Sequence, residues 1–149
     1  MSRIEKILVP VDFSEHSAKA LEMAVDLAKS FGASIQLLHC YQIQPAGVSP
    51  YGIVLPESFD RDLREAAGRQ LGEWRDKVAA QGVEVEASLS SMFPSLAISE
   101  TASEAGTDLI VMGTSGLSGI KHVLLGSVAE RTLRVAPCPV LTVKGGESS

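Results

Sequence analysis

The sequence predicts an α/β protein with one doubly wound, five-stranded parallel sheet, strand order 3-2-1-4-5 and helices on both faces. Three observations lead to this fold class. Short apolar segments alternate with segments of helical periodicity along the chain, which is the pattern of parallel strands joined by right-handed crossovers. The first and fourth apolar segments, Ile7–Val9 and Asp108–Met112, are apolar on both faces and belong in the centre. The third, Val83–Leu89, alternates apolar and polar residues and belongs at an edge.

The first half of the chain predicts two strands and two helices. The strand Ile7–Val9 is followed, after Asp12, by a helix that stops at Gly32. The apolar positions of this helix are Leu21, Ala24, Val25, Ala28 and Phe31. The second strand is Ile35–Leu38, and a loop rich in proline and glycine follows, from about Gln42 to Pro56. The apolar face of the second helix consists of Leu63, Ala67, Leu71, Trp74 and Val78.

The second half predicts the remaining elements in alternation. They are the strand Val83–Leu89, a short helix from about Ser95 to Ala105, the strand Asp108–Met112, a loop from Gly113 to Leu125, a helix from Ser127 and the strand Val140–Val143. Gly106 ends the short helix, and the segment Pro137-Cys138-Pro139 breaks the last one. No linker divides the chain, so we expect one domain over residues 1–144 and a polar tail over 145–149.

The most informative segment is the glycine loop directly after the fourth strand. It contains Gly113, Gly116 and Gly119, and Gly126 and Ser127 follow at a helix start. Glycines let the backbone approach an anion, and the N–H groups of the loop and of the helix N-terminus bind it. Asp12 follows the first strand, and both segments then reach the switch point of the sheet, where ligands bind. The Rossmann fingerprint and the Walker A motif are absent, which argues against NAD, FAD and ATP motors of those types.

These features also have structural interpretations. The glycines can serve only a tight turn, although a bare turn needs fewer of them. Ser127 and Glu130 fit a capping box, and so do Asp12 and Glu15. Asp12 then either caps the following helix or holds a ribose hydroxyl or a Mg²⁺ ion that the phosphates bring. The sequence leaves these alternatives open.

The remaining polar side chains indicate no catalytic centre. The three histidines lack metal-ligand spacing. We interpret His39 as packed or hydrogen-bonded at a strand end, and His16 and His122 as solvent-facing. No nucleophile with an adjacent base is identifiable, because Ser115 lacks the G-x-S-x-G elbow and Cys138 lies between two prolines. We therefore expect no catalytic residue.

Composition limits the partners and the compartment. The net charge of −5 over 149 residues opposes nucleic-acid binding, which needs a basic face. Two cysteines indicate a reducing compartment rather than a disulfide framework. The N-terminus has no apolar signal core, and no apolar run approaches the length of a membrane span. We expect a cytoplasmic protein with neither a nucleic-acid nor a membrane partner.

Four segments resemble the universal stress protein family, and the similarity covers essentially the whole chain. They are Val9–Ser17, Asp108–Gly116, Leu124–Arg131 and Ala136–Val140. The pattern G-x₂-G-x₉-G-[ST], which marks the ATP-binding branch of that family, is filled by Gly113, Gly116, Gly126 and Ser127. The resemblance implies a five-stranded parallel α/β domain that forms a homodimer, often through the last strand, here Val140–Val143. An apolar edge strand also needs a cover on physical grounds.

The resemblance further implies which residues contact the nucleotide. Asp12 would lie by the ribose and phosphates, with Mg²⁺, and the residues around Cys40 would touch adenine. The segment Gly113–Gly119, with Ser127 and Val128, would wrap the phosphates. The complete implied site is Pro10, Val11, Asp12, Cys40, Met112, Gly113, Thr114, Ser115, Gly116, Leu117, Gly119, Gly126, Ser127 and Val128.

Two positions depart from the family pattern. Met92-Phe93-Pro94 stands where Gly-x-Pro is usual, which alters the loop before the third helix. Ser115 stands where histidine or arginine is common, which removes a contact to the phosphates and weakens the expected affinity for ATP.

The expected function is that of an ATP-binding regulatory switch in stress response, acting on an unknown protein partner. We expect at most slow hydrolysis, because the chain has neither a Walker lysine nor an evident general base. AMP or another adenine nucleotide is an alternative ligand. Two other functions stay open: a phosphoryl- or nucleotidyl-transfer enzyme that uses the same crevice, and a ligand-free dimeric interaction module whose glycines are architectural.

Overall fold

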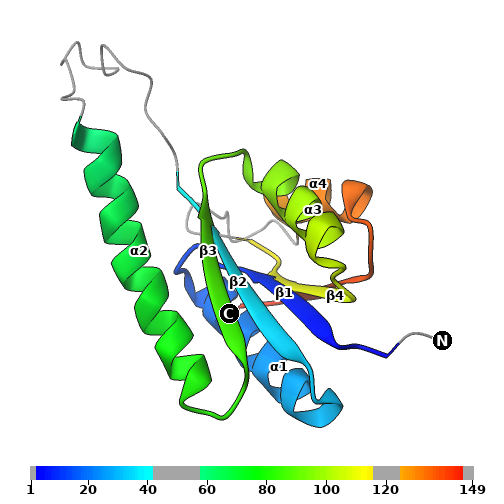
Figure 1. Ribbon diagram of the computed structural model, residues 1–149. Coiled ribbons are helices and arrows are strands. Elements are labelled where there is room, and N and C mark those ends of the chain that lie inside the picture. The colour runs from blue at the N-terminus through cyan, green and yellow to red at the C-terminus, as the bar shows by residue number, and fades with distance from the viewer. Residues whose placement is uncertain (1–2, 42–57, 116–124, 146–149) are drawn as a thin grey trace.

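The computed structural model describes residues 3–41, 58–115 and 125–145, and at its centre lies a five-stranded, all-parallel sheet. The strands are β1 (Lys6–Pro10), β2 (Ser34–Cys40), β3 (Val85–Ser90), β4 (Leu109–Gly113) and β5 (Val140–Val143). They lie in the order β3-β2-β1-β4-β5, as Figure 1 shows for the first four. The predicted fold class and strand order are confirmed.

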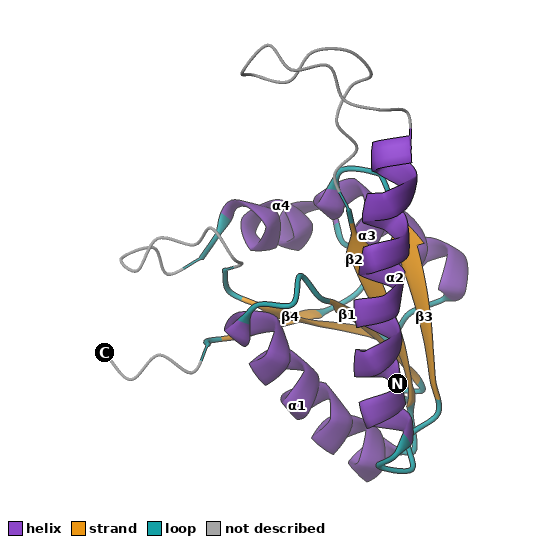
Figure 2. Ribbon diagram, turned by 90° about the vertical axis from the view of Figure 1, so that its left-hand side faces the viewer, coloured by secondary structure: helices purple, strands orange, loops and turns teal. Residues whose placement is uncertain are grey.

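Helices cover both faces of the sheet. The described part of the chain contains α1 (Glu15–Phe31), α2 (Ser58–Ala79), α3 (Pro94–Ala105) and α4 (Ser127–Val135). The first two pack on one face, and α3 and α4 pack on the other. Figure 2 shows β1 and β4 lying between α1 and α4. The connections that leave β1 and β4, which contain α1 and α4, therefore lie on opposite faces, and the boundary between these strands is the switch point that the sequence predicted.

The centre of the sheet is closed to water on both sides. Ile7, Leu8 and Val9 of β1 are at most 1% exposed, and every residue of β4 is buried. Ile7 and Val9 belong to the core cluster under α1 and α2, whereas Leu8 belongs to the cluster under α3 and α4. Successive side chains of a strand point to opposite faces, so a strand covered on both faces has no polar alternation.

Glycines end the helices where the sequence predicted it. Gly32 and Gly106 have φ values of 69° and 67°, the left-handed conformation that glycine adopts without a steric penalty. The N–H group of Gly32 donates to the carbonyl of Ala28 and closes α1. Phe31, which we expected on the buried face, is 45% exposed. It is the last residue of α1, where the chain already turns toward β2.

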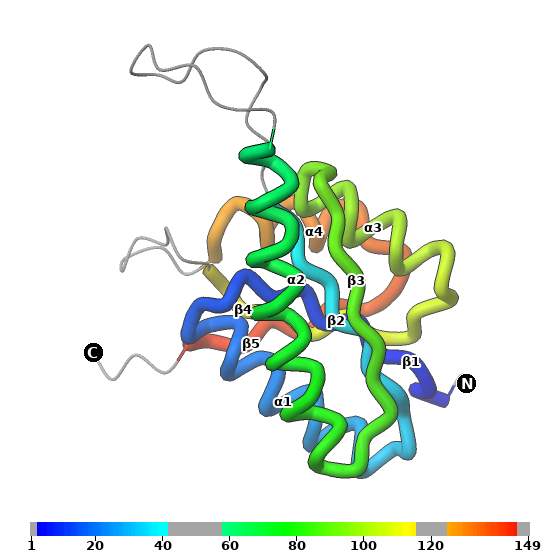
Figure 3. Tube along the Cα trace, turned by 60° about the vertical axis from the view of Figure 1, so that its left-hand side comes forward, coloured from blue at the N-terminus to red at the C-terminus, as the bar shows by residue number. Residues whose placement is uncertain are grey.

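The two edges of the sheet differ in their cover. β3 is half-buried along most of its length, and α2 packs against it, as the alternating pattern predicted. It begins at Val85, two residues later than expected, because its pairing with β2 starts there. β5 forms the opposite edge (Figure 3), and no described strand pairs with its outer side.

Candidate functional site

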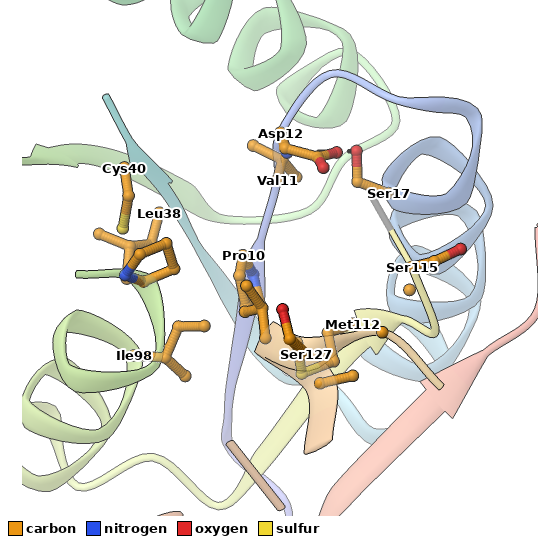
Figure 4. A pocket seen from close by; sticks show the side chains of 15 residues that line it. Pro10, Val11, Asp12, Ser17, Leu38, Cys40, Ile98, Met112, Ser115 and Ser127 are labelled. Carbon is orange, nitrogen blue, oxygen red and sulfur yellow. Dashed lines mark hydrogen bonds between the residues drawn. The ribbon is translucent and has the colours of Figure 1, made fainter. Parts of the chain in front are cut away.

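A cavity of about 260 Å³ opens at the carboxyl ends of β1 and β4, at the switch point of the sheet. Its walls come from the ends of β1, β2 and β4 and from the first turns of α1, α3 and α4 (Figure 4). The lining residues are Pro10, Val11, Asp12, Ser17, Leu38, Cys40, Pro94, Ile98, Met112, Gly113, Ser115, Gly126, Ser127, Val128 and Ala129. We call this space the β1–β4 cavity.

One end of the β1–β4 cavity is apolar. Leu38 and Cys40 from β2 and Ile98 from α3 lie together on one side of Pro10 (Figure 4). Burial raises the pKa of the Cys40 thiol to about 11, because the thiolate loses its hydration there. The thiol is therefore neutral at physiological pH and forms part of an apolar wall. Such a wall suits a flat, uncharged ring.

The other end is polar and carries Asp12, Ser17 and Ser115 (Figure 4). The backbone N–H of Asp12 donates to Ser17 Oγ at 3.3 Å. The Oδ1 atom of Asp12 accepts from the backbone N–H of Ser14 at 3.0 Å. Among the described residues that line the cavity, only Asp12 has an ionisable carboxylate, and none is a lysine, arginine or histidine. Backbone N–H groups and serine hydroxyls are therefore the described groups of the cavity that can bind an anion.

Asp12 is not the helix cap that one interpretation of the sequence proposed. The N-cap of α1 is Ser14, whose Oγ accepts from the backbone N–H of Ser17 at 3.2 Å. Phe13 lies between Asp12 and Ser14 with φ 66°, a left-handed conformation that is uncommon for a bulky residue. This turn delays the helix start by two residues, so the capping box of Asp12 and Glu15 does not form.

The strained turn at Phe13 is held by its neighbours. Its ring lies 4.3 Å from the ring of His39 and 5.3 Å from that of Trp74, measured between centroids. His39 Nδ1 lies 2.8 Å from the carbonyl oxygen of Val11. The expectation that His39 is a packed, hydrogen-bonded histidine is confirmed. These contacts fix the segment that carries Asp12 into the cavity.

The start of α4 also differs from the capping-box interpretation. The N-cap residue is Gly126, so no side chain forms a capping hydrogen bond, and Ser127 is the first helical residue. Glu130 pairs instead with Arg134, with 2.8 Å between Oε1 and Nη2. Because Gly126, Ser127 and Val128 line the cavity, the positive end of the α4 dipole lies at its wall.

Two of the predicted glycines, Gly113 and Gly126, lie where two segments of the chain approach each other closely. A Cβ atom at Gly113 would lie 2.8 Å from His16 Cβ and 2.9 Å from its carbonyl carbon. A Cβ atom at Gly126 would lie 3.1 Å from the carbonyl oxygen of Thr114, which accepts from the Gly126 N–H at 2.5 Å. The architectural interpretation of these two glycines is therefore supported, although both also line the cavity.

The remaining predicted site residues fall into two groups. Thr114 is buried, donates its N–H to the carbonyl of Val143 at 3.0 Å, and does not line the cavity. Gly116, Leu117 and Gly119 lie outside the described residues, as does His122. Five lining residues were not predicted: Ser17, Leu38, Pro94, Ile98 and Ala129. Leu38 lies near the carboxyl end of β2, and the other four lie near the N-termini of α1, α3 and α4. No motif in the sequence marked them.

His16 is not solvent-facing, which corrects our expectation. It is half-buried, and Ser115 Oγ lies 3.3 Å from its Nδ1 and 3.2 Å from its Nε2. The structure thus pairs a serine with a base that the sequence did not reveal. An oxygen in the ring plane at such similar distances would overlap Cε1, so Oγ lies over the ring. It is not aligned with a nitrogen lone pair, as an activated nucleophile would be.

The described residues contain neither a cluster of metal ligands nor a helix that could span a membrane. No three side chains of histidine, cysteine, aspartate or glutamate lie close enough together there to hold a metal ion. No helix among those residues is both long and apolar enough to cross a membrane. A divalent ion in the cavity would therefore need ligand oxygens in addition to the carboxylate of Asp12.

Comparison with known proteins identifies similar chains over nearly the whole length. The family model described as the universal stress protein family matches residues 3–144. Universal stress protein YxiE of Bacillus subtilis is 37% identical over 145 residues, which cover 93% of this chain and 98% of that relative. The structure of universal stress protein UspA from Lactobacillus plantarum has a TM-score of 0.76 at 25% identity, covering 96% and 99%. A universal stress protein solved in complex with cAMP has a TM-score of 0.70 at 27% identity, covering 96% and 98%.

Proposed function

The chain belongs to the universal stress protein family, and from that membership we propose that it binds an adenine nucleotide, with ATP as the expected ligand, in the β1–β4 cavity. The supporting observation is that this cavity joins an apolar end to the N-terminus of a helix without a side-chain cap. One similar protein was solved in complex with cAMP. We propose that nucleotide occupancy acts as a regulatory switch toward a protein partner in stress response.

Different residues of the cavity would contact the adenine, the ribose and the phosphates. The adenine ring would lie between the wall of Leu38 and Cys40 and the side chain of Ile98. The ribose would lie by Asp12, whose carboxylate accepts hydrogen bonds from hydroxyl groups. The phosphates would bind the first-turn N–H groups of α4, beginning at Gly126.

Mg²⁺ fits this site as an ion that the nucleotide brings. The donor is the carboxylate of Asp12, a hard oxygen ligand of the kind that Mg²⁺ prefers. Mg²⁺ usually keeps several water molecules and takes one or two carboxylates together with substrate phosphates. The ion would offset the repulsion between Asp12 and the phosphates.

We propose binding rather than rapid turnover. Ser115 and His16 are close, but the hydroxyl lies over the imidazole ring and not along a lone pair. No other lining residue places a base beside a nucleophile in the described part of the cavity. Hydrolysis is therefore expected to be slow, and no observation favours the transferase alternative.

We also propose that two copies pair through β5. Leu141 in this strand is 37% exposed, and no described strand pairs with its outer side. An unpaired apolar edge favours association with another strand. The occupant we propose is the same strand of a second copy.

Mg·ATP is expected to raise the melting temperature of the protein. A ligand that binds only the folded state stabilises it by mass action, by about 2.7 kcal/mol at ~100-fold excess over Kd. This corresponds to a shift of roughly 5–10 °C for a chain of this size. Protein whose mass spectrum shows no bound nucleotide should be heated with Mg·ATP and with Mg²⁺ alone. An unchanged melting temperature at millimolar Mg·ATP would contradict the proposed function.

Bound nucleotide is expected to protect Cys40 from alkylation and to leave Cys138 unprotected. Cys40 lines the cavity, and Cys138 does not. Burial raises the pKa of both thiols, and Asp108 adds to the effect at Cys138. Both should therefore react slowly at neutral pH and faster as the pH rises and thiolate forms. Iodoacetamide at about pH 9, read for each cysteine by peptide mass spectrometry, makes Cys138 the internal control. Equal alkylation rates of Cys40 with and without ATP would show that the adenine ring does not bind beside it.

Two substitutions at Asp12 are expected to separate its structural and ligand roles. Asp12→Asn keeps an oxygen that accepts from Ser14 but removes the charge, so the free energy of Mg·ATP binding should weaken by more than the free energy of unfolding. Asp12→Ala also removes the hydrogen bond, which should cost about 0.5–1.5 kcal/mol of stability. Calorimetric titration and urea unfolding measure the two quantities. Native Mg·ATP affinity in Asp12→Asn would show that the carboxylate charge serves no ligand.

A further inference from the structure

Three segments that are far apart in the chain meet at the half-buried side chain of His16. His16 belongs to the first turn of α1, Gly113 ends β4, and Gly145 follows β5. A Cβ atom at Gly145 would lie 2.5 Å from Nδ1, 2.6 Å from Cε1 and 2.8 Å from Cγ of the ring. Such similar distances to three ring atoms place Gly145 over a face of the imidazole. The oxygen of Ser115 also lies over the ring, 3.2–3.3 Å from its nitrogens.

Gly113 also lies close to the backbone of His16. A Cβ atom at Gly113 would meet the Cβ, carbonyl carbon and carbonyl oxygen of His16 at 2.8–3.0 Å. Only a residue without a side chain permits this approach of β4 to α1. Glycine at both 113 and 145 therefore leaves room for one flat side chain between the exits of β4 and β5.

The ring of His16 supports a wall of the β1–β4 cavity. His16 does not line the cavity, but Gly113 and Ser115, which it contacts, both do. Ser115 in turn lies against the α4 N-cap, because a Cβ atom at Gly126 would lie 3.2 Å from Ser115 Cα. A chain of direct contacts thus runs from His16 through Ser115 to Gly126.

We propose that His16 is a positioning residue for the nucleotide pocket, and that its flat ring, rather than its nitrogens, holds the Ser115 segment in the binding conformation. This inference rests on the proposed nucleotide binding. A wall that is already ordered loses less conformational freedom when the phosphates bind. Removal of the ring should therefore weaken binding although no contact to the ligand is removed.

The test is the affinity of purified variants for Mg·ATP, measured by calorimetric titration. His16→Ala removes the ring, His16→Asn keeps a polar group without a ring, and His16→Phe keeps a flat ring without nitrogens. We expect about tenfold weaker binding for the first two and near-native binding for the third, since ordering one segment changes affinity by about this factor. Val78→Ala is the control, because Val78 is 1% exposed in α2 and its truncation lowers stability remote from the cavity. Its affinity should stay native.

Gly145→Ala provides a second route that leaves His16 in place. Its Cβ would displace the ring, so binding should weaken, although position 145 does not line the cavity. Native affinity in both His16→Ala and Gly145→Ala overturns the inference and leaves the proposed function intact. Binding retained by His16→Asn but lost by His16→Phe also overturns it, because the nitrogens would then be the active feature. Failure of the unmodified protein to bind Mg·ATP overturns both proposals.

Discussion

Replacing Gly113 by alanine is expected to lower the free energy of unfolding by about 1–3 kcal/mol, the usual range for overpacking a close-packed interior. The new methyl group would lie within 3.0 Å of three atoms of His16, two of them backbone carbonyl atoms. Backbone atoms cannot rotate away as the end of a side chain can, so β4 and the first turn of α1 must separate. Urea unfolding measures the change.

Gly68→Ala is the matched control for this substitution. Gly68 lies inside α2, and its new Cβ would meet Leu89 Cδ1 at 3.6 Å, an ordinary van der Waals contact. Alanine is favoured over glycine within a helix by roughly 0.5–1 kcal/mol, so this variant should be stabilised. The same chemical change should thus have opposite signs at the two positions. Equal stability of both variants would mean that β4 and α1 are not in close contact.

The order of the strands could be predicted because the burial of a strand determines its pattern of apolar and polar residues. Ile7–Val9 and Leu109–Met112 show no polar alternation, and the structure buries both segments on two faces. Val83–Leu89 alternates, and β3 lies at an edge. Helix stops at Gly32 and Gly106 were equally predictable, because the left-handed conformation there selects glycine.

The helix starts at the cavity were not predictable in the same way. The pattern of an oxygen-bearing residue three positions before glutamate occurs at Asp12 and at Ser127, yet the caps are Ser14 and Gly126. At the first site the reason is the left-handed turn at Phe13, a residue that carries no local signal for that conformation. A local pattern cannot reveal a turn that is held by distant packing.

The residues that form the cavity walls were also not predictable from local patterns. Ile98 and Ala129 project into it from helices, and their direction depends on how α3 and α4 pack on the sheet. His16 contacts Ser115, 99 residues away, only because β4 ends beside α1. The place of the site followed from topology, whereas its walls followed from packing that the sequence pattern does not express.

The exposed edge of β5 has a backbone geometry that permits a specific test of the proposed dimer. The carbonyls of Pro139 and Val143 accept hydrogen bonds from the N–H groups of Ile110 in β4 and of Thr114 directly after it. Backbone groups of successive residues in a strand point to opposite sides. Val140 and Thr142 must therefore direct their N–H and C=O groups to the outer edge, where a second copy would pair.

Val140→Pro is expected to convert the dimer to a folded monomer. Proline removes the outward N–H of this residue and no hydrogen bond to β4, and proline is tolerated on edge strands. Ala87→Pro is the matched control at the opposite edge, where Ile35 and Tyr41 donate to the carbonyls of Glu84 and Ser90 and the groups of Ala87 point outward. Light scattering should report a monomer for the first variant and a dimer for the second, each with a native circular dichroism spectrum. A folded Val140→Pro dimer would place the interface away from β5, and a monomeric unmodified protein would exclude the pairing altogether.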